Sequence, residues 1–243
     1  YSAIALWCKK NGTMPHGNNQ WGKDVTHTHE RGVATQHESA SAASHKNEPT
    51  RTATGSGPAT WYHDHTMFGI ADLNGNVWDW CAGLRLKDGE IQIIPYANCM
   101  RATCDMSDGS SEWKAIKIDG TLVAPGTADT LKYDFVTSKI QLTNKITVSE
   151  DAGRGSTFGG MTKAEAVTDA PQIIKELTLY PADAEAEYEG DYFYMNNKGE
   201  RFPIRGGSWA DGAGAGVFYT ALSDPRSGVG SFIGFRSAFY GEL

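Results

Sequence analysis

The chain has 243 residues and a formal net charge of −7. This length allows one large domain with a core of its own. The excess of acidic residues indicates no basic surface that would bind phosphates, which argues against a nucleic-acid partner. No run of about 18 apolar residues occurs, so no membrane-spanning helix or membrane insertion is predicted. The 28 glycines and the 11% of aromatic residues are typical of loop-rich folds held by aromatic anchors.

The first predicted elements are a short helix and a long loop. The stretch YSAIALWCKK, residues 1–10, places apolar residues on or near one helical face, and Asn11-Gly12 supplies a C-terminal stop. Because the chain opens directly in this helix with Tyr1 and not with Met, we expect a further segment upstream. Residues 12–58 contain almost no aliphatic side chains and cannot bury a layer, so they are predicted to be loop. Three aromatic residues are expected to anchor that loop to the core: Trp21, Trp61 and Tyr62.

Short strands separated by turns are predicted for the rest of the chain. Asn74-Gly75, Asp88-Gly89 and Asp119-Gly120 mark turns. A short helix is predicted to begin at Pro171 and to end before Pro181. The expected strands lie at 77–80, 90–94, within 114–123, within 138–149 and at 191–195, and an Asn-Lys-Gly turn then leads to the closing segment from Arg205. The predicted class is α+β, with short strands, few helices and long loops.

The four cysteines are too few and too scattered for a disulfide scaffold in a chain of this length. Cys99 and Cys104 are close enough in sequence to pair across a turn. The favoured interpretation is that all four, including Cys8 and Cys81, are free thiols that pack as small apolar side chains. No CxxC occurs, so a structural zinc site is not predicted.

Two groups of residues have the ligand types of a metal site. The pairs His27/His29 and His63/His65 have a spacing that can direct two rings toward a metal from an extended strand. Their polar loop context favours surface or hydrogen-bonded histidines. A group of oxygen-bearing side chains has the ligand type that calcium prefers, but no acidic residue closes an EF-hand loop, so turn capping is favoured and calcium is the alternative: Asp72, Asn74, Asn76 and Asp79.

No sequence motif for nucleophilic, phosphate-binding or zinc-protease chemistry occurs. Cys81 follows Trp80, and this apolar flank favours a buried, inert thiol over a reactive one. Three arginines could cradle an anion, but the favoured role is hydrogen bonding that ties irregular loops: Arg205, Arg226 and Arg236.

Two stretches together resemble a known family. FGIADLNGNVWDW, residues 68–80, is similar to the G-x-x-D-x-x-G-N-V-x-E/D-W signature of the formylglycine-generating-enzyme (sulfatase-modifying) branch of the C-type lectin fold. RGGSW from Arg205, followed by GVF, RS and IGFR, resembles the end of that domain. The resemblance implies one C-type lectin-like domain over 1–243. Residues 114–191 match only loosely and form a candidate insertion.

Within that branch, the closing segment 205–238 is most similar to the variable proteins of diversity-generating retroelements, particularly those of gut phages. In such proteins a template-directed reverse transcriptase replaces adenines in the last coding segment. Lys, Glu, Gln, Trp and Met are excluded at the diversified positions, and none of them stands at the matching positions here. The resemblance implies that these are the diversified, ligand-binding residues: Ala210, Asp211, Gly214, Tyr219, Ala221, Ser223, Asp224, Gly228, Gly230, Ser231 and Phe232.

The resemblance also implies an architecture for this segment. The eleven positions would face solvent as one paratope-like patch on a rigid scaffold. The scaffold side chains expected to pack inward are Trp209, Val217, Phe218, Leu222, Ile233 and Phe235.

The implied function is non-enzymatic binding, without a catalytic site or an assigned cofactor. The expected ligand is a host or bacterial surface protein or glycan, and the expected location is a phage tail or a bacterial cell surface. A homo-oligomer is compatible with the resemblance. A rival function is that of an oxidase or sulfoxide synthase of the same branch, although no cysteine follows Cys104 to supply the pair such enzymes carry near the end of the domain. A passive virion protein is a second rival, and a Gly-rich surface loop without a binding role is a third.

Overall fold

The computed structural model describes residues 1–183 and 188–237, and within them it is a mostly-sheet protein with few helices. This confirms the predicted α+β class. The α-helices of the described chain are α1 (Ser2–Asn11) and α2 (Gln172–Glu176), and single 3₁₀ turns occur at Ala59–Trp61, Asn98–Met100, Phe158–Gly160 and Gly212–Gly214. The strands are β1 (Trp78–Trp80), β2 (Leu84–Lys87), β3 (Glu90–Ile93), β4 (Lys114–Ile116), β5 (Leu122–Val123), β6 (Lys132–Val136), β7 (Lys139–Thr143), β8 (Arg154–Thr157), β9 (Thr162–Lys163), β10 (Tyr192–Met195), β11 (Glu200–Gly206), β12 (Gly216–Asp224) and β13 (Ile233–Gly234).

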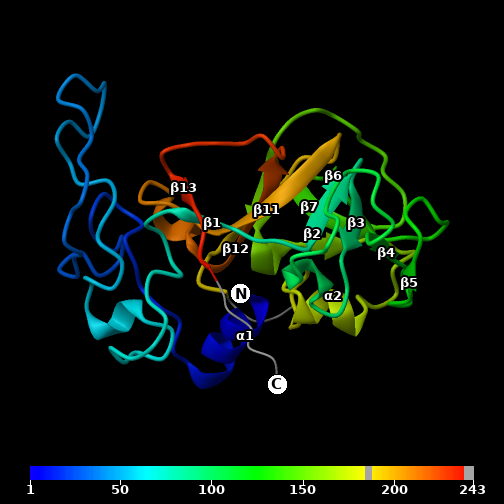
Figure 1. Ribbon diagram of the computed structural model, residues 1–243, viewed down its shortest axis with the longest axis horizontal. Helices are drawn as coiled ribbons and strands as arrows, with labels where there is room; N and C mark the ends of the chain where they lie inside the picture. The colour runs from blue at the N-terminus through cyan, green and yellow to red at the C-terminus, as the bar shows by residue number, and fades with distance from the viewer. Residues whose placement is uncertain (184–187, 238–243) are drawn as a thin grey trace.

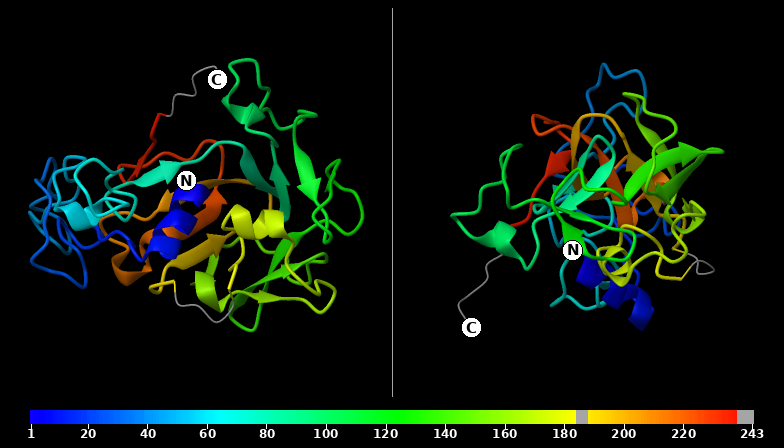
Figure 2. Two further views of the ribbon diagram at one scale, coloured as in Figure 1. Left: turned by 90° about the horizontal axis from the view of Figure 1, so that it is seen from below. Right: turned by 90° about the vertical axis from the view of Figure 1, so that its right-hand side faces the viewer.

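The described strands join into a mixed sheet (Figure 1). Its main path runs β8-β10-β12-β11-β2-β3-β6-β7-β9. The short strand β1 adds to β11 and to β13, and β4 adds to β3 and β5. Helices α1 and α2 contact each other, and α1 also contacts β12 (Figure 2). Strand β12 therefore has a helix packed near one of its sides.

The N-terminal predictions are largely confirmed. Helix α1 ends at Gly12, whose φ of 67° lets its N–H reach the carbonyls of Cys8 and Lys9. Residues 12–58 contain no helix or strand, only isolated bridges. Their loops form one end of the molecule, at the left of Figure 1. Trp61 and Tyr62 are buried as expected, but Trp21 stacks on His45 within the loop, with 4.1 Å between ring centroids.

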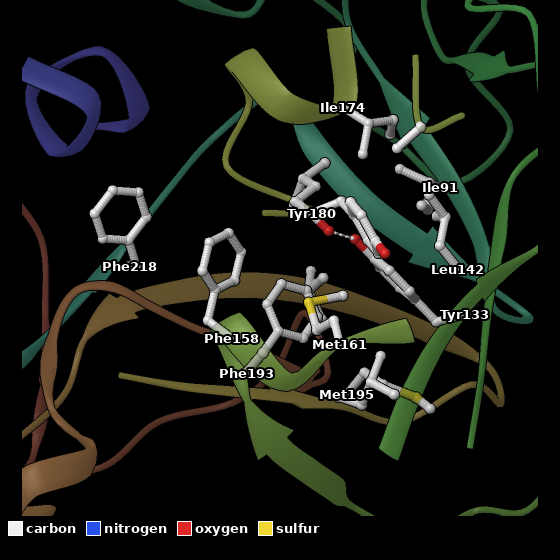
Figure 3. Packing of buried hydrophobic residues seen from close by; sticks show 14 of the residues in the cluster. Ile91, Tyr133, Leu142, Phe158, Met161, Ile174, Tyr180, Phe193, Met195 and Phe218 are labelled. Atoms are coloured by element: carbon white, nitrogen blue, oxygen red, sulfur yellow. Dashed lines mark hydrogen bonds between the residues drawn. The ribbon is translucent and has the colours of Figure 1, made fainter. Parts of the chain in front are cut away.

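A large core unites the two halves of the chain. The candidate insertion, 114–191, contributes Tyr133 and Phe158 to the core that also holds Phe193 of β10 and Phe218 of β12 (Figure 3). The Phe158 ring centroid lies 5.4 Å from that of Phe218. Whatever its evolutionary origin, this segment therefore shares one core with the rest of the chain.

Asp134 caps the loop that follows β7, and its titration should be visible in stability. Its carboxylate accepts hydrogen bonds from the Thr147 N–H at 2.7 Å, the Thr147 hydroxyl at 2.6 Å and the Phe135 N–H at 2.8 Å. Burial opposes ionisation, but these hydrogen bonds outweigh it and lower the Asp134 pKa. The stabilisation is therefore present above the unfolded-state pKa of about 3.9 and is lost as pH falls through the lower folded-state pKa.

Asp134→Asn is accordingly expected to cost on the order of 2 kcal/mol at pH 7, because Asn is uncharged and places a donor where the N–H groups need acceptors. Urea unfolding at pH 7 and pH 3 measures this. The difference between variant and wild type should shrink at the lower pH. An equal difference at both values would contradict the role of the charge.

Candidate functional site

Strand β12 organises the segment that the sequence singled out. It lies between β10, with which it runs parallel, and β11, with which it runs antiparallel. Phe218 and Leu222 point into the large core and are fully buried. Tyr219 and Ala221 point to the opposite face, into a smaller cluster with Trp78. The first seven residues of the strand are thus buried, and Ser223 and Asp224 at its end are half-buried. The side of the strand that carries Tyr219 and Ala221 is the candidate binding face.

The eleven predicted positions are distributed unevenly. Nine have solvent access: Ala210, Ser231 and Phe232 are exposed, and Asp211, Gly214, Ser223, Asp224, Gly228 and Gly230 are half-buried. Tyr219 and Ala221 are only 7% and 5% exposed, so the expectation that all eleven face solvent is wrong for these two. The reason is that β11 lies between β1 and β12, and the Trp78 side chain of β1 packs against Tyr219, with 4.3 Å between the ring centroids.

The part of the closing segment that follows β12 folds back toward β1. The chain leaves β12 at Asp224 and runs back over the sheet to β13, which pairs with β1 (Figure 1). The Trp78 N–H donates to the Phe232 carbonyl at 2.9 Å, which fixes this return. Phe232 therefore lies beside Trp78, the residue that packs against Tyr219.

The expected scaffold residues are confirmed with one exception. Trp209, Val217, Phe218 and Leu222 are buried, and Ile233 is half-buried. Phe235 is 77% exposed, so the inward packing predicted for it is wrong. Its neighbour Arg236 explains the difference, because that side chain, and not Phe235, turns inward to bind Asp79 of β1.

Sequence reasoning missed two tyrosines on this face. In β10, Phe193 and Met195 are fully buried in the core, whereas Tyr192 and Tyr194 alternate with them on the other side. Tyr192 is 37% exposed, and its ring centroid lies 6.3 Å from that of Tyr219. The period-two alternation of YFYM was the signal that could have placed them on the candidate binding face.

The three arginines act as ties between loops. Arg236 Nε lies 2.5 Å from Asp79 Oδ2, and its other nitrogens donate to the carbonyls of Ala71 and Asp72. Burial raises the pKa of the Asp79 carboxyl, and the Arg236 guanidinium opposes that rise. Arg205, only 2% exposed, donates to the Leu177 carbonyl at 2.9 Å. Arg226 forms an ion pair with Glu200.

The oxygen-bearing side chains that were considered as calcium ligands, within residues 72–79, accept hydrogen bonds from other parts of the protein. Asp72 Oδ2 accepts from the Gly55 N–H at 2.8 Å, Asn76 Oδ1 accepts from the Thr52 N–H at 2.9 Å, and Asp79 binds Arg236. Asn74 takes the same kind of role, because its Oδ1 accepts from the Asn19 amide. Each of these groups thus faces a different protein partner, so this set does not fit a calcium ion. The interpretation as loop-capping groups is supported.

The histidines of the two pairs make separate contacts. His63 Nδ1 accepts from the Ile70 N–H at 2.8 Å, and His65 Nε2 lies 3.2 Å from the Met14 carbonyl. The His27 ring stacks on His16 at 3.8 Å, and His29 lies beyond it. Across residues 1–183 and 188–237, no three His, Cys, Asp or Glu side chains are arranged to hold a metal ion.

The cysteines are free thiols, so Cys99 and Cys104 do not form the disulfide that their spacing allows. Cys81 lines a large cavity of about 1380 Å³ together with Arg205 and Asp79. Burial raises the pKa of the Cys81 thiol. Because the thiolate is the nucleophile and metal ligand, this environment favours the inert form.

Within the described part of the chain, no helix has the length and apolar character needed to cross a bilayer. Comparisons with models of known protein families and with curated proteins give no match to this chain.

Proposed function

We propose that this chain is a diversified ligand-binding protein of the retroelement type, built on a C-type lectin-like fold of the formylglycine-generating-enzyme branch. It binds a surface protein or glycan through the face that β12 and the returning segment 224–233 build. Its location would be a phage tail or a bacterial cell surface. The motif resemblance supplies the family, and the geometry of the closing segment supports the role.

One observation carries the proposal. The segment separates residues that hold the fold from residues that face outward. Its anchors, Trp209, Arg205 and Arg236, are buried or bound to distant parts of the chain, whereas three of the eleven predicted positions are exposed and six are half-buried. Exposed substitutions away from caps and special backbone positions usually change stability by less than about 0.5 kcal/mol. Such positions can vary while the scaffold stays folded.

The test is a graft at four of the nine positions that have solvent access. Ala210, Ser223, Ser231 and Phe232 are replaced together with another set of permitted types, such as Tyr, Asn, His and Ser. We expect the melting temperature to change by no more than about 4 °C, since each change costs little. Adsorption of the purified protein to a panel of bacterial strains should change its strain profile.

A matched control carries four substitutions in the exposed part of the long N-terminal loop, at Gln36, Ser39, Ser41 and Lys46. This variant should keep the wild-type strain profile. A strain profile that the graft leaves unchanged would count against the proposal. If the wild-type protein adsorbs to none of the strains, a passive virion protein is favoured. An independent check is the neighbouring DNA, which should hold a near-copy of the closing segment with Asn codons beside a reverse-transcriptase gene.

A further inference from the structure

We propose that the binding face contains a cation-binding site that combines two of the variable positions with two residues outside them. The site consists of Tyr192, Tyr194, Tyr219 and Asp211, here called the tyrosine site, and its occupant is an arginine or lysine side chain of a protein partner. This inference rests on the proposed function, because it names the chemistry that the same face recognises.

The first step is that β10 and β12 place the three rings together. The strands pair with Tyr194 opposite Ala221, so Tyr192 comes beside Tyr219 on the same face of the sheet. The centroids of Tyr192 and Tyr194 are 6.4 Å apart with an interplanar angle of 29°. Tyr219 stands across Tyr192 at an angle of 68°. Two rings thus lie nearly parallel and a third closes one end.

The second step concerns access to the rings. A Cβ added at Gly155 of β8 would come within 2.4 Å of the Tyr194 ring, so that ring packs on the β8 backbone and a ligand can reach only the rest of it. A Cβ added at Gly214 would lie 3.4 Å from Tyr192 Cδ2, an ordinary contact. A larger side chain at 214 would therefore pack against Tyr192 and cover it. Since 214 is one of the predicted variable positions, its residue would decide how much of Tyr192 a ligand can reach.

The third step is charge. The faces of tyrosine rings are electronegative. No hydrogen bond of the Tyr192, Tyr194 or Tyr219 hydroxyls is found to any described residue. Burial raises the pKa of Tyr219, and the Asp211 carboxylate raises it further. Asp211 Oδ2 accepts from the Ser208 N–H at 2.7 Å and from its hydroxyl, and Asp211 has no ion-pair partner among residues 1–183 and 188–237. The turn that carries Asp211 packs against the rings, because a Cβ at Gly207, next to Ser208, would lie 3.2 Å from Tyr219 Cδ1 and one at Gly214 would lie 3.4 Å from Tyr192 Cδ2.

Aromatic faces beside an unpaired carboxylate select a cation. A guanidinium stacks on aromatic rings and binds a carboxylate at the same time, so arginine satisfies both parts of the site. A neutral glycan could stack on the rings, but it would gain no attraction to the Asp211 charge. The observations therefore favour a basic side chain of a protein partner, and a glycan becomes an outcome of the test.

The experiment uses N-acetyl-arginine methylamide as the probe and its neutral isostere, N-acetyl-citrulline methylamide, as the comparison. The chain carries ¹³C-labelled tyrosine rings, and the ring signals are followed by NMR during titration. Arginine should shift the signals of Tyr192, Tyr194 and Tyr219, and citrulline should bind about fivefold more weakly or worse.

Two variants test the assignment. Tyr194→Leu and Asp211→Asn should each weaken arginine binding about fivefold, and Asn keeps an acceptor for the Ser208 N–H. The matched controls are Tyr96→Leu, at a ring that is 87% exposed on another loop, and Asp119→Asn, at another turn carboxylate. Both controls should bind as the wild type does.

Equal shifts with arginine and citrulline, or full binding by Asp211→Asn, would overturn the cation site. Ring shifts with methyl glucoside that survive Asp211→Asn would assign the rings to a glycan instead. An absence of any shift with arginine also overturns this inference, while the graft experiment still decides the proposed function. Conversely, if the graft does not change the strain profile but arginine still binds, the cation site is supported and the proposed function is wrong.

Discussion

Arg236→Met is expected to lower the free energy of unfolding by about 3 kcal/mol, because it leaves the Asp79 carboxylate buried without its partner. The Asp79 side chain is 6% exposed, and Arg236 is its ion-pair partner at 2.5 Å. The variant also loses the donors to the carbonyls of Ala71 and Asp72. Methionine keeps most of the apolar stem, so the loss reports the charge and the hydrogen bonds. Urea unfolding at pH 7 measures it.

The matched control is Arg226→Met in the same segment. Arg226 pairs with Glu200, but its side chain is 46% exposed, so the expected loss is no more than about 1 kcal/mol. Burial already raises the pKa of Asp79, and removal of Arg236 takes away the charge that opposes this rise. A carboxyl group whose folded-state pKa is raised lowers the free energy of unfolding more and more as the pH rises through its pKa values. The loss caused by Arg236→Met should therefore be smaller at pH 4 than at pH 7. Equal losses for the two arginine variants would show that the Asp79 pair is not an anchor.

The ion pair also links stability to the binding face. Arg236 closely follows the short strand β13, and β13 holds the return of the segment through its pairing with Trp78 and Asp79. Without Arg236, the pairing of β13 with β1 is no longer held by the ion pair to Asp79, and Phe232 is no longer fixed beside Trp78. We therefore expect Arg236→Met to weaken ligand adsorption as well, although the residue touches no proposed ligand.

The sequence predicted the parts of this structure that local rules control. Gly12 ends the first helix because its positive φ completes the cap. Asp88 and Gly89, with φ of 47° and 76°, make the turn between β2 and β3 that the Asp-Gly pair indicated. Arg205 and Arg236 tie loops, as a chain with so many irregular segments requires.

The main failure was β12, the longest strand described. No period was visible in GVFYTALSD because seven successive residues are buried, with the core on one face and the Trp78 cluster on the other. Strands covered on both faces lose the alternation that identifies strands with one face exposed to water. The same cover explains why Tyr219 and Ala221 are buried. Since β1, which supplies that cover, lies far earlier in the chain, local sequence could not reveal it.

Asn76→Asp is the second large effect that we expect, with a loss of about 3 kcal/mol in unfolding free energy. Asn76 is 5% exposed and joins the long N-terminal loop to the turn before β1. Its Oδ1 accepts from the Thr52 N–H at 2.9 Å and from the Asn18 amide at 3.3 Å, and its Nδ2 donates to the Thr52 carbonyl at 3.1 Å. Aspartate has the same shape, but it places a charged oxygen against that carbonyl.

Urea unfolding measures the loss, and limited proteolysis within residues 31–56 reports release of the loop. The matched control is Asn11→Asp, because the Asn11 amide also donates to a carbonyl, that of Trp7 at 2.8 Å, but in an exposed position. Water can replace that hydrogen bond, so the control should lose less than about 1 kcal/mol. Faster proteolysis is expected only for Asn76→Asp. If both variants unfold and are cleaved alike, burial of the Asn76 amide does not hold the loop, and the loop must depend on the other contacts of Asn18 and Asn19.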